Sequence, residues 1–124
     1  MKYLFITLSS IVVAYLVVLV FIYFYQRNLL YHPSENNYQN DEIKFKYEEV
    51  NIEVENEIKL KSWLINKDFN KFKTLLIFHG NAGDLSNRIY KLNELNKLEI
   101  NILLISWRGF SGNKGFPTEN NLYS

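Results

Sequence analysis

The sequence predicts an α/β fold that follows one apolar helix, and three patterns lead to this prediction. Residues 4–25 contain no charged side chain. Residues 50–65 largely alternate apolar and polar side chains, which is typical of half-buried strands. Two continuous apolar runs, residues 74–78 and 100–105, then flank a segment whose apolar side chains have helical spacing.

The apolar segment near the amino terminus is long enough to cross a membrane. A helix over residues 4–26, at about 1.5 Å per residue, spans a hydrocarbon core of about 30 Å. A cleaved signal peptide has a shorter apolar region that ends in small residues, whereas bulky side chains occupy residues 21–25. A buried core helix shows a polar face, and this segment has none. We therefore expect a retained, single-pass anchor after a short flank of residues 1–3, with the lipid bilayer as its partner.

The charges beside this segment give a slight indication of its orientation. Lys2 and the amino terminus precede it and Arg27 follows it, which weakly favours an amino terminus in the cytoplasm. Residues 27–45 contain a proline and a cluster of polar side chains, and they are predicted to be a linker. His32, close to the membrane boundary, is expected to be solvated. The remaining residues, 46–124, are expected to form an incomplete α/β domain.

The first part of this domain is predicted to be an antiparallel hairpin. Residues 50–55 and 58–65 each show a period of two, and the polar residues 56–57 are a plausible turn between them. The polar residues 66–73 are expected to form a loop. A hairpin of this kind supplies the antiparallel edge of a mixed sheet.

A βαβ unit is predicted next. The apolar runs at residues 74–78 and 100–105 suit strands of a parallel sheet that is covered on both faces. Residues 84–98 between them form the expected crossover helix, and the Asp84 carboxylate can cap its first turn. Thr118 is expected to cap another helix, which the sequence follows for about one turn. We therefore expect the chain to be a fragment, a truncated gene product or the result of an incomplete gene model.

The composition argues against several classes of function. A net charge of +1 gives no basis for a nucleic-acid surface. The absence of cysteine excludes disulfides, cysteine nucleophiles and thiolate metal sites. With two histidines in the sequence, a histidine-rich metal site is not expected. We expect no metal, no organic cofactor and no nucleic-acid partner.

The sharpest local motif is HGNAG, residues 79–83, between a predicted strand and a predicted helix. Its glycines allow a tight turn and a close approach of the backbone to a ligand. Main-chain N–H groups of such a loop and of a helix start can point at a developing negative charge, such as the oxyanion of acyl transfer. A nucleotide-binding loop is an alternative, but the sequence lacks both the Gly-x-Gly-x-x-Gly pattern and the Gly-Lys-Ser/Thr ending.

The stretches TLLIFHGNAGDLSNR and INILLISWRGFSGNKGFPTENNLYS resemble the α/β-hydrolase superfamily. They look most like a branch of membrane-anchored serine hydrolases with a single span and an HGNAG loop, and the anchor, RNLLYHPS and the hairpin also fit that branch. The resemblance implies that residues 46–124 are the first part of an α/β-hydrolase domain. It also implies hydrolysis of esters, thioesters or amides, with an acyl-ester, thioester or peptide-like small substrate in a full-length parent.

The resemblance further implies an oxyanion hole in which the main-chain N–H of Asn81 is one donor, while His79, Gly80, Ala82 and Gly83 support the loop. The second donor follows the catalytic serine of a Gly-x-Ser-x-Gly elbow, and the acid and the histidine of the triad come later still. The sequence contains no such elbow, so this chain alone is predicted to be inactive. The alternative is a non-catalytic, membrane-tethered remnant or binding module.

Two other residues resemble functional ones. Ser111 lies in a sequence similar to the elbow, but the fifth position is Asn113 instead of glycine, so Ser111 is expected to be a turn residue that shapes a pocket rim. Arg108 can bind an anionic substrate, but in the resembling loop such an arginine more often anchors the loop by hydrogen bonds. Trp107 stands where that loop commonly has tyrosine.

Overall fold

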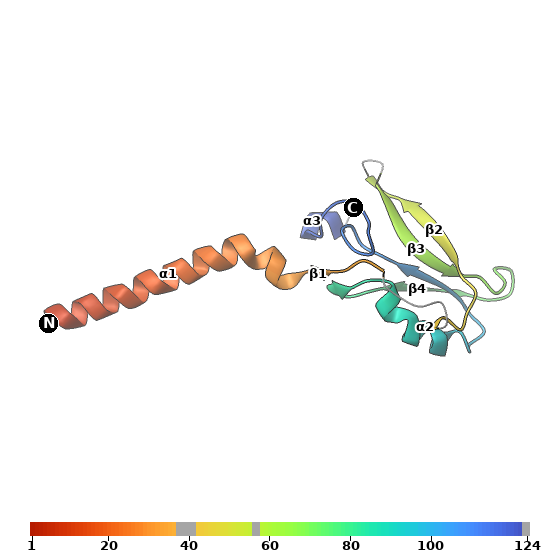
Figure 1. Cartoon of the computed structure of the whole chain (residues 1–124), viewed down its shortest axis with the longest axis horizontal. Coiled ribbons are helices and arrows are strands. Elements are labelled where there is room, and N and C mark those ends of the chain that lie inside the picture. The colour runs from red at the N-terminus through yellow and green to blue at the C-terminus, as the bar shows by residue number, and fades with distance from the viewer. Residues whose placement is uncertain (37–41, 56–57, 123–124) are drawn as a thin grey trace. The chain divides into compact units, whose positions relative to one another are not determined.

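The structure is a computed structural model of the chain, and it describes residues 1–36, 42–55 and 58–122 (Figure 1). The chain divides into two compact units, Met1–Leu30 and Tyr31–Ser124. The turn predicted at residues 56–57 lies outside the described residues.

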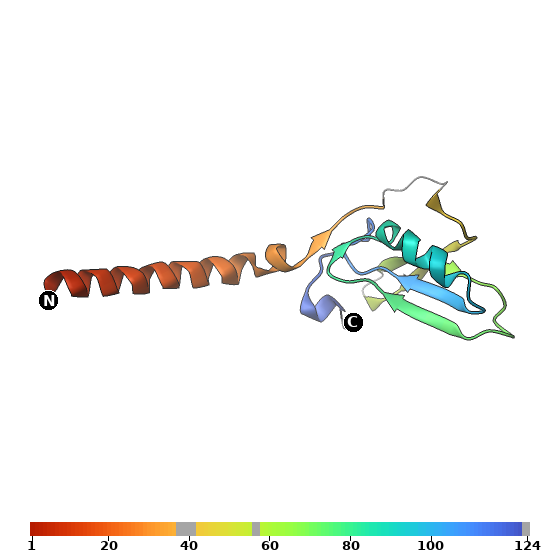
Figure 2. The same ribbon diagram turned by 90° about the horizontal axis from the view of Figure 1, so that it is seen from below.

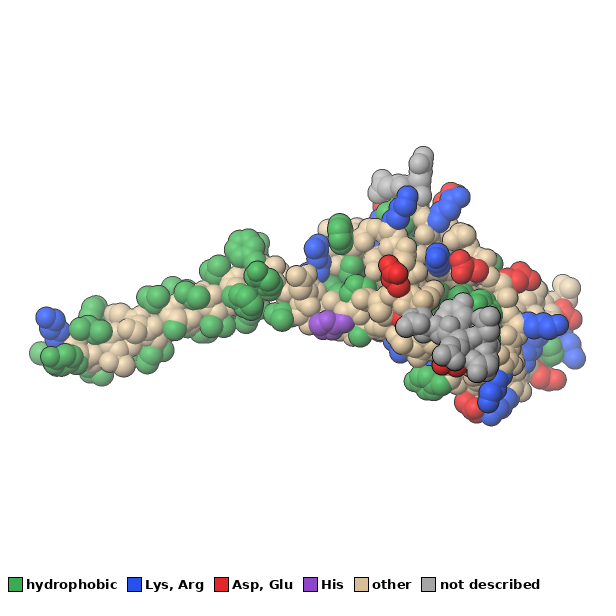
Figure 3. All heavy atoms as spheres, viewed as in Figure 1, with side chains coloured by type: hydrophobic (Ala, Val, Ile, Leu, Met, Phe, Trp, Pro, Cys, Tyr) green, Lys and Arg blue, Asp and Glu red, His purple; other side chains and the backbone are tan. Residues whose placement is uncertain are grey.

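The first unit is helix α1, Lys2–Leu30. None of its residues is buried, and Figure 3 shows hydrophobic side chains along its length. The Ser10 hydroxyl donates to the carbonyl of Ile6 at 2.9 Å, so this polar group is satisfied inside the helix. By length and composition α1 can cross a membrane, and it is the one such helix in the part of the chain that the structure describes.

Helix α1 continues four residues beyond the end predicted at residue 26. Residues 27–30 contain no glycine or proline, so nothing in them opposes a helix. Pro33 disfavours helical dihedral angles at the residue before it, which agrees with an end at Leu30.

The second unit contains a four-stranded sheet in the order β2-β3-β6-β4. Strand β2 (Glu48–Glu53) pairs antiparallel with β3 (Lys59–Ile65), and β3 pairs antiparallel with β6 (Asn101–Ile105). Strand β4 (Thr74–Phe78) pairs parallel with β6. The predicted hairpin, βαβ unit and mixed sheet are confirmed.

Helix α2, Ile89–Leu95, lies over one face of this sheet (Figures 1 and 2). A 3-10 turn, Ser86–Arg88, precedes it, so the regular helix is shorter than the predicted range of residues 84–98. The apolar side chains at helical spacing pack on the sheet: Leu85, Ile89 and Leu92 are buried, and Leu95 is partly buried. The buried core consists of Phe45, Trp63, Ile65, Leu85, Ile89, Leu92, Ile102 and Leu104.

Strand β4 departs from its prediction. Its apolar run indicated a strand covered on both faces, and the internal strand β6 is indeed mostly buried. Strand β4 is instead an edge strand of the described sheet, and Leu76 and Phe78 are 55% and 52% exposed. An apolar edge with unpaired backbone groups favours pairing with another chain.

Two segments close to the ends of the second unit complete the fold. The Asn121 N–H donates to the hydroxyl of Thr118 at 3.2 Å, so Thr118 caps helix α3, Glu119–Leu122, as predicted. Strand β1, His32–Pro33, pairs parallel with β5, Ala82–Gly83. The range predicted as a linker, residues 27–45, therefore contributes a strand to the domain, and its residues 37–41 lie outside the described residues.

The exposed edge of β4 is expected to make the purified chain self-associate. Leu76→Lys places a charge on this edge and should shift the detergent-solubilised chain toward monomer, because a charged edge strand pairs poorly with a second strand. Analytical ultracentrifugation measures the change. The matched control is Leu98→Lys, which charges a leucine that is 52% exposed outside the sheet. An equal shift for both variants, or none for Leu76→Lys, would contradict the assignment of the association to the β4 edge.

Candidate functional site

The HGNAG loop, residues 79–83, follows the carboxyl end of strand β4. Phe78 is the register partner of Ile105 in β6, so the loop and Ser106 leave the sheet side by side. In open α/β sheets, ligands bind at the carboxyl ends of the parallel strands. His79 is buried, while the next three residues of the loop are exposed. The structure therefore places the predicted site at the edge where this class of fold forms ligand sites.

His79 supports the loop from inside. Its Nδ1 lies 2.8 Å from the carbonyl oxygen of Gly80, and its Nε2 lies 3.2 Å from Ser106 Oγ. Because a carbonyl only accepts, Nδ1 carries the proton and donates to Gly80. The Gly80 carbonyl belongs to the same trans peptide unit as the N–H of Asn81, so the two groups point in opposite directions. His79 thereby sets the direction of the Asn81 N–H.

The charge state of His79 agrees with this supporting role. Burial is the main influence and lowers the pKa of the ring from 6.5, and the charge of Arg88 also lowers it. The hydrogen bond with Gly80 and the carboxylate of Asp84 raise the pKa, but the net pKa remains lowered. The ring is therefore neutral at pH 7 and keeps one donating and one accepting nitrogen.

Trp107 fixes the beginning of the loop. Its indole Nε1–H donates to the main-chain oxygen of His79 at 2.8 Å. The indole ring also stacks on Phe78, with ring centroids 5.1 Å apart. An indole N–H and a tyrosine hydroxyl lie at different positions relative to the main chain. The hydrogen bond from Trp107 to His79 therefore depends on the tryptophan found here.

Asp84, directly after the loop, is a buried carboxylate that accepts hydrogen bonds from Ser34, Ser86 and Asn87. It is 2% exposed. The hydroxyls of Ser34 and Ser86 donate to its two oxygens, and the N–H of Asn87 donates to Oδ1 at 3.1 Å. Charge-assisted hydrogen bonds of this kind offset the cost of removing a carboxylate from water. The carboxylate thus joins Ser34, which is distant in sequence, to the start of the helical segment.

Asp84 and Asn87 cap the helical segment reciprocally. While the Asn87 N–H donates to the Asp84 carboxylate, the Asp84 N–H donates to Asn87 Oδ1 at 3.0 Å. This arrangement corresponds to a capping box and satisfies two N–H groups at a helix start. It confirms Asp84 as a capping residue, although the turn that it caps is the 3-10 turn Ser86–Arg88 before helix α2.

The pKa of Asp84 reflects these donors. Burial alone raises the pKa of the carboxyl, but the hydrogen bonds from Ser34, Ser86 and Asn87 outweigh burial and lower the pKa below 3.8. The unfolded chain therefore binds this proton more readily than the folded chain. The ionised carboxylate stabilises the fold above pH 3.8, and this contribution is lost as the pH falls through the folded-state pKa.

The segment after helix α1 runs along the HGNAG loop. The His32 N–H donates to the carbonyl of Asn81 at 2.9 Å, and the Ser34 N–H donates to the carbonyl of Gly83 at 3.1 Å. The Ser34 carbonyl in turn accepts from the N–H of Ser111 at 2.9 Å. Sequence reasoning placed this segment in a linker, because two residues of parallel pairing leave no periodic pattern. The one available signal is Pro33, which favours an extended backbone at His32.

Ser111 lies in a turn, as expected, and its side chain is buried. It is 2% exposed and has a φ of 55°, in the left-handed region. Its Oγ accepts from the Leu85 N–H at 3.0 Å and from the Ser106 hydroxyl at 2.9 Å. A buried hydroxyl with these contacts is a structural link between its turn and the start of the helical segment.

Arg108 is buried close to Gly115. Its side chain is 4% exposed, and its Nε and Nη2 have no hydrogen-bond partner among the described residues. Its aliphatic part packs close to Gly115, where an added Cβ would lie 3.5 Å from Arg108 Cβ. Packing of this aliphatic part is one contact by which Arg108 supports its loop.

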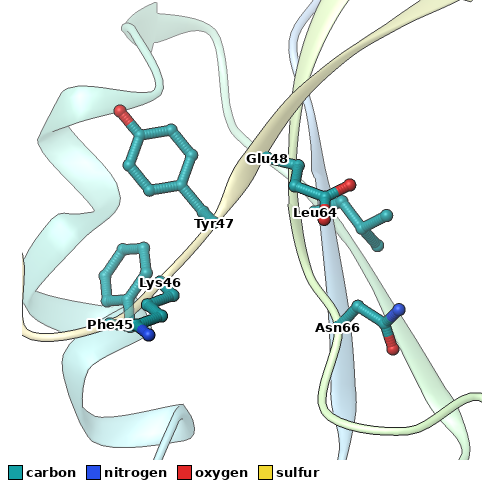
Figure 4. A pocket seen from close by; sticks show the side chains of 6 residues that line it. All are labelled: Phe45, Lys46, Tyr47, Glu48, Leu64 and Asn66. Atoms are coloured by element: carbon teal, nitrogen blue, oxygen red, sulfur yellow. The ribbon is translucent and has the colours of Figure 1, made fainter.

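The described residues contain no candidate metal centre, and the pocket drawn in Figure 4 lies away from the loop. Within residues 1–36, 42–55 and 58–122, no three His, Cys, Asp or Glu side chains gather to hold a metal ion. A pocket of about 540 Å³ lies near residues 45–48, Leu64 and Asn66 (Figure 4). Leu64 pairs with Leu103 and Ile65 with Ile102, toward the amino-terminal end of β6. This pocket is therefore at the opposite end of the sheet from the HGNAG loop.

The chain is similar in sequence to longer proteins. Protein bem46 of Schizosaccharomyces pombe is 30% identical over 116 residues, which are 86% of this chain and 39% of that protein. An uncharacterized protein of Mycobacterium tuberculosis is 31% identical over 107 residues, 85% of this chain and 38% of that protein. The α/β hydrolase domain-containing protein WAV2 of Arabidopsis thaliana is 28% identical over 79 residues, 61% of this chain and 25% of that protein. The chain thus spans well under half the length of these relatives. It matches no family model.

The second unit is also similar to solved structures. One crystal form of the Pyrococcus furiosus esterase Pf2001 matches with a TM-score of 0.55 and 19% identity, over 75% of this chain and 37% of that chain. A second form gives a TM-score of 0.53 and 19% identity, over 70% and 34%. At this level of identity the likeness concerns the fold.

The geometry of the loop predicts different outcomes for its two glycines. Gly83 has a φ of +85°, and a Cβ there would lie 2.1 Å from Asn87 Oδ1, the acceptor for the Asp84 N–H. Gly83→Ala should therefore destabilise the loop by about 2 kcal/mol, through backbone strain and a lost hydrogen bond. Faster amide hydrogen exchange at Asp84 and Leu85 reports this change.

Gly80→Ala is the matched control for this experiment. An added Cβ at Gly80 meets no atom within 4 Å, and its φ is not in the left-handed region. Exchange at Asp84 should therefore stay close to that of the unaltered chain. Equal effects of the two substitutions would show that the loop does not have the conformation described.

Proposed function

Because the chain belongs to the α/β-hydrolase superfamily, we propose that it is the amino-terminal part of a membrane-anchored serine hydrolase. The proposed reaction is hydrolysis of an ester, a thioester or an amide. The observation that carries the proposal is the HGNAG loop at the carboxyl ends of strands β4 and β6. Its exposed main chain is held in place by buried polar groups, which is the preorganisation that oxyanion stabilisation requires.

In the proposed reaction, a serine hydroxyl of the longer protein attacks the carbonyl carbon of the substrate. The carbonyl oxygen then becomes an oxyanion, and the main-chain N–H of Asn81 donates one of the hydrogen bonds that stabilise it. His79 directs this N–H through the Gly80 carbonyl. Gly83 permits the turn into the capping segment. The serine, the acid and the histidine of the triad are expected from the longer protein.

The outer edge of strand β4 is a suitable place for the strand that carries this serine. Helix α3 begins after Thr118 and is the next helix along the chain after β6. A right-handed crossover through α3 can return the chain as a strand parallel to β4. The carboxyl end of that strand would then lie beside the HGNAG loop, where a nucleophile has to be. The exposed side chains of Leu76 and Phe78 would be covered by the additional structure.

Helix α1 is proposed to be the membrane anchor, with the amino terminus in the cytoplasm. Its length, its apolar composition and its lack of a polar face support a span. The orientation rests on the positions of Lys2 and Arg27 and is a weak preference. The substrate class proposed for the longer protein is a small molecule with an acyl-ester, thioester or peptide-like bond.

The chain of 124 residues is proposed to be inactive by itself. Its sequence contains no Gly-x-Ser-x-Gly elbow. Ser111, the residue in the most similar sequence, is buried, and its Oγ accepts two hydrogen bonds. A non-catalytic, membrane-tethered role is the competing proposal, and it is favoured by the same two observations. The two proposals differ in what a longer reading frame encodes.

The experiment begins with the coding sequence after Ser124, which should encode a Gly-x-Ser-x-Gly elbow and a later histidine. In the longer protein, Asn81→Pro removes the main-chain N–H, and kcat for a small ester should fall about a hundredfold to a thousandfold. Asn81→Ala changes the side chain but keeps the N–H, so kcat should stay close to that of the unaltered protein. A frame without these motifs would remove the basis of the proposal, and equal activity of the two variants would remove the Asn81 N–H from the oxyanion hole.

A further inference from the structure

We propose that residues 32–34, which we call the strap, position the HGNAG loop, so that the loop takes its working shape only when the chain directly after helix α1 is docked on it. The functional role of this loop shape rests on the proposed function, in which the main-chain N–H of Asn81 donates to an oxyanion. The docking itself rests on hydrogen bonds of the described residues. The strap thereby becomes part of the site and not a passive connection to the anchor.

The first support is the way in which two consecutive peptide units of the loop are held. The unit between Gly80 and Asn81 has its carbonyl bound by His79 Nδ1 at 2.8 Å. The unit between Asn81 and Ala82 has its carbonyl bound by the strap, through the His32 N–H at 2.9 Å. With both units fixed, the dihedral angles of Asn81 between them are fixed too. The hydrogen bond from His79 fixes the peptide unit before Asn81, and the hydrogen bond from the strap fixes the peptide unit after it.

The second support is the exposure of the loop. Gly80, Asn81 and Ala82 are exposed, so packing into the core does not hold them. The loop also contains two glycines, whose backbones have wide conformational freedom. A loop of this kind has a fixed shape only if its backbone groups are hydrogen-bonded. The strap donates to two of its carbonyls, at Asn81 and at Gly83.

The third support is the set of partners of Ser34. Its N–H donates to Gly83, its carbonyl accepts from Ser111, and its hydroxyl donates to the Asp84 carboxylate. One residue of the strap thus links the end of the loop, the turn after β6 and the cap of the helical segment. A hydroxyl is needed for the third link, which alanine lacks and threonine keeps. Ser34 is therefore a positioning residue that acts through Gly83 and Asp84.

The test compares Ser34→Ala with Ser34→Thr in the full chain, solubilised in detergent. Ser34→Ala should raise amide hydrogen exchange about tenfold in residues 79–87 and 106–112, because a buried carboxylate loses a donor. Exchange in strand β3 should not change. The amide resonance of Asn81 should shift in the nuclear magnetic resonance spectrum of Ser34→Ala and return in Ser34→Thr, which restores the hydroxyl.

The matched control is Ser62→Ala. Ser62 is fully buried, and its hydroxyl donates to the Leu60 carbonyl at 3.4 Å within strand β3, away from the loop. This substitution should leave residues 79–87 unaffected. If Ser34→Ala does not fold, Ser34→Cys serves in its place, because a thiol is a weaker donor and should give a smaller effect of the same pattern.

Two results would overturn the proposal. One is unchanged exchange and an unchanged Asn81 resonance in Ser34→Ala. The other is faster exchange in all segments alike, strand β3 included, which would make the strap a general contribution to stability. Neither readout involves catalysis. The expected exchange pattern in a longer protein that hydrolyses no ester, thioester or amide would leave the strap in place and remove the hydrolase proposal alone.

Discussion

The buried carboxylate of Asp84 is the interaction on which the candidate site depends. A charge removed from water is costly unless donors surround it. Here the hydroxyls of Ser34 and Ser86 and the N–H of Asn87 provide those donors, and each comes from a segment that must be correctly placed to do so. If the strap or the start of the helical segment moves away, the buried carboxylate loses a donor and the free energy of the folded state rises. The HGNAG loop lies directly before Asp84 and is fixed at that end.

The sheet determines the position of the HGNAG loop, and hydrogen bonds of polar groups determine its conformation. Strands β4 and β6 end together, which brings His79 beside Ser106 and Trp107. Apolar burial holds the helix on the sheet but does not reach the exposed loop residues. The loop is instead fixed by hydrogen bonds from inside, through His79, and along its length, through the strap. This division explains how an exposed, glycine-containing segment can have one conformation.

The sequence predicted the strands, the helix face and Asp84 as a cap because each depends on local periodicity or on one side chain. It failed where the structure depends on distant pairing. The strap pairs over two residues, too few for a pattern, and Pro33 and Ser34 had the composition of a linker. The exposure of β4 depends on its place in the sheet, which its apolar run does not encode. The burial of Ser111 depends on Leu85 and Ser106, which lie elsewhere in the chain.

The central claim is that Asp84 is an ionised, fully hydrogen-bonded carboxylate that organises the site, and its pKa tests this claim most directly. The sequence has three aspartates, so selective ¹³C labelling of aspartate in the full chain, with Asp41→Asn and Asp68→Asn for assignment, resolves its titration. The account predicts a pKa for Asp84 below 3.8, because the donors from Ser34, Ser86 and Asn87 outweigh burial. A pKa at or above 3.8 would mean that burial prevails, that these donors are not in place, and that the carboxylate does not organise the loop.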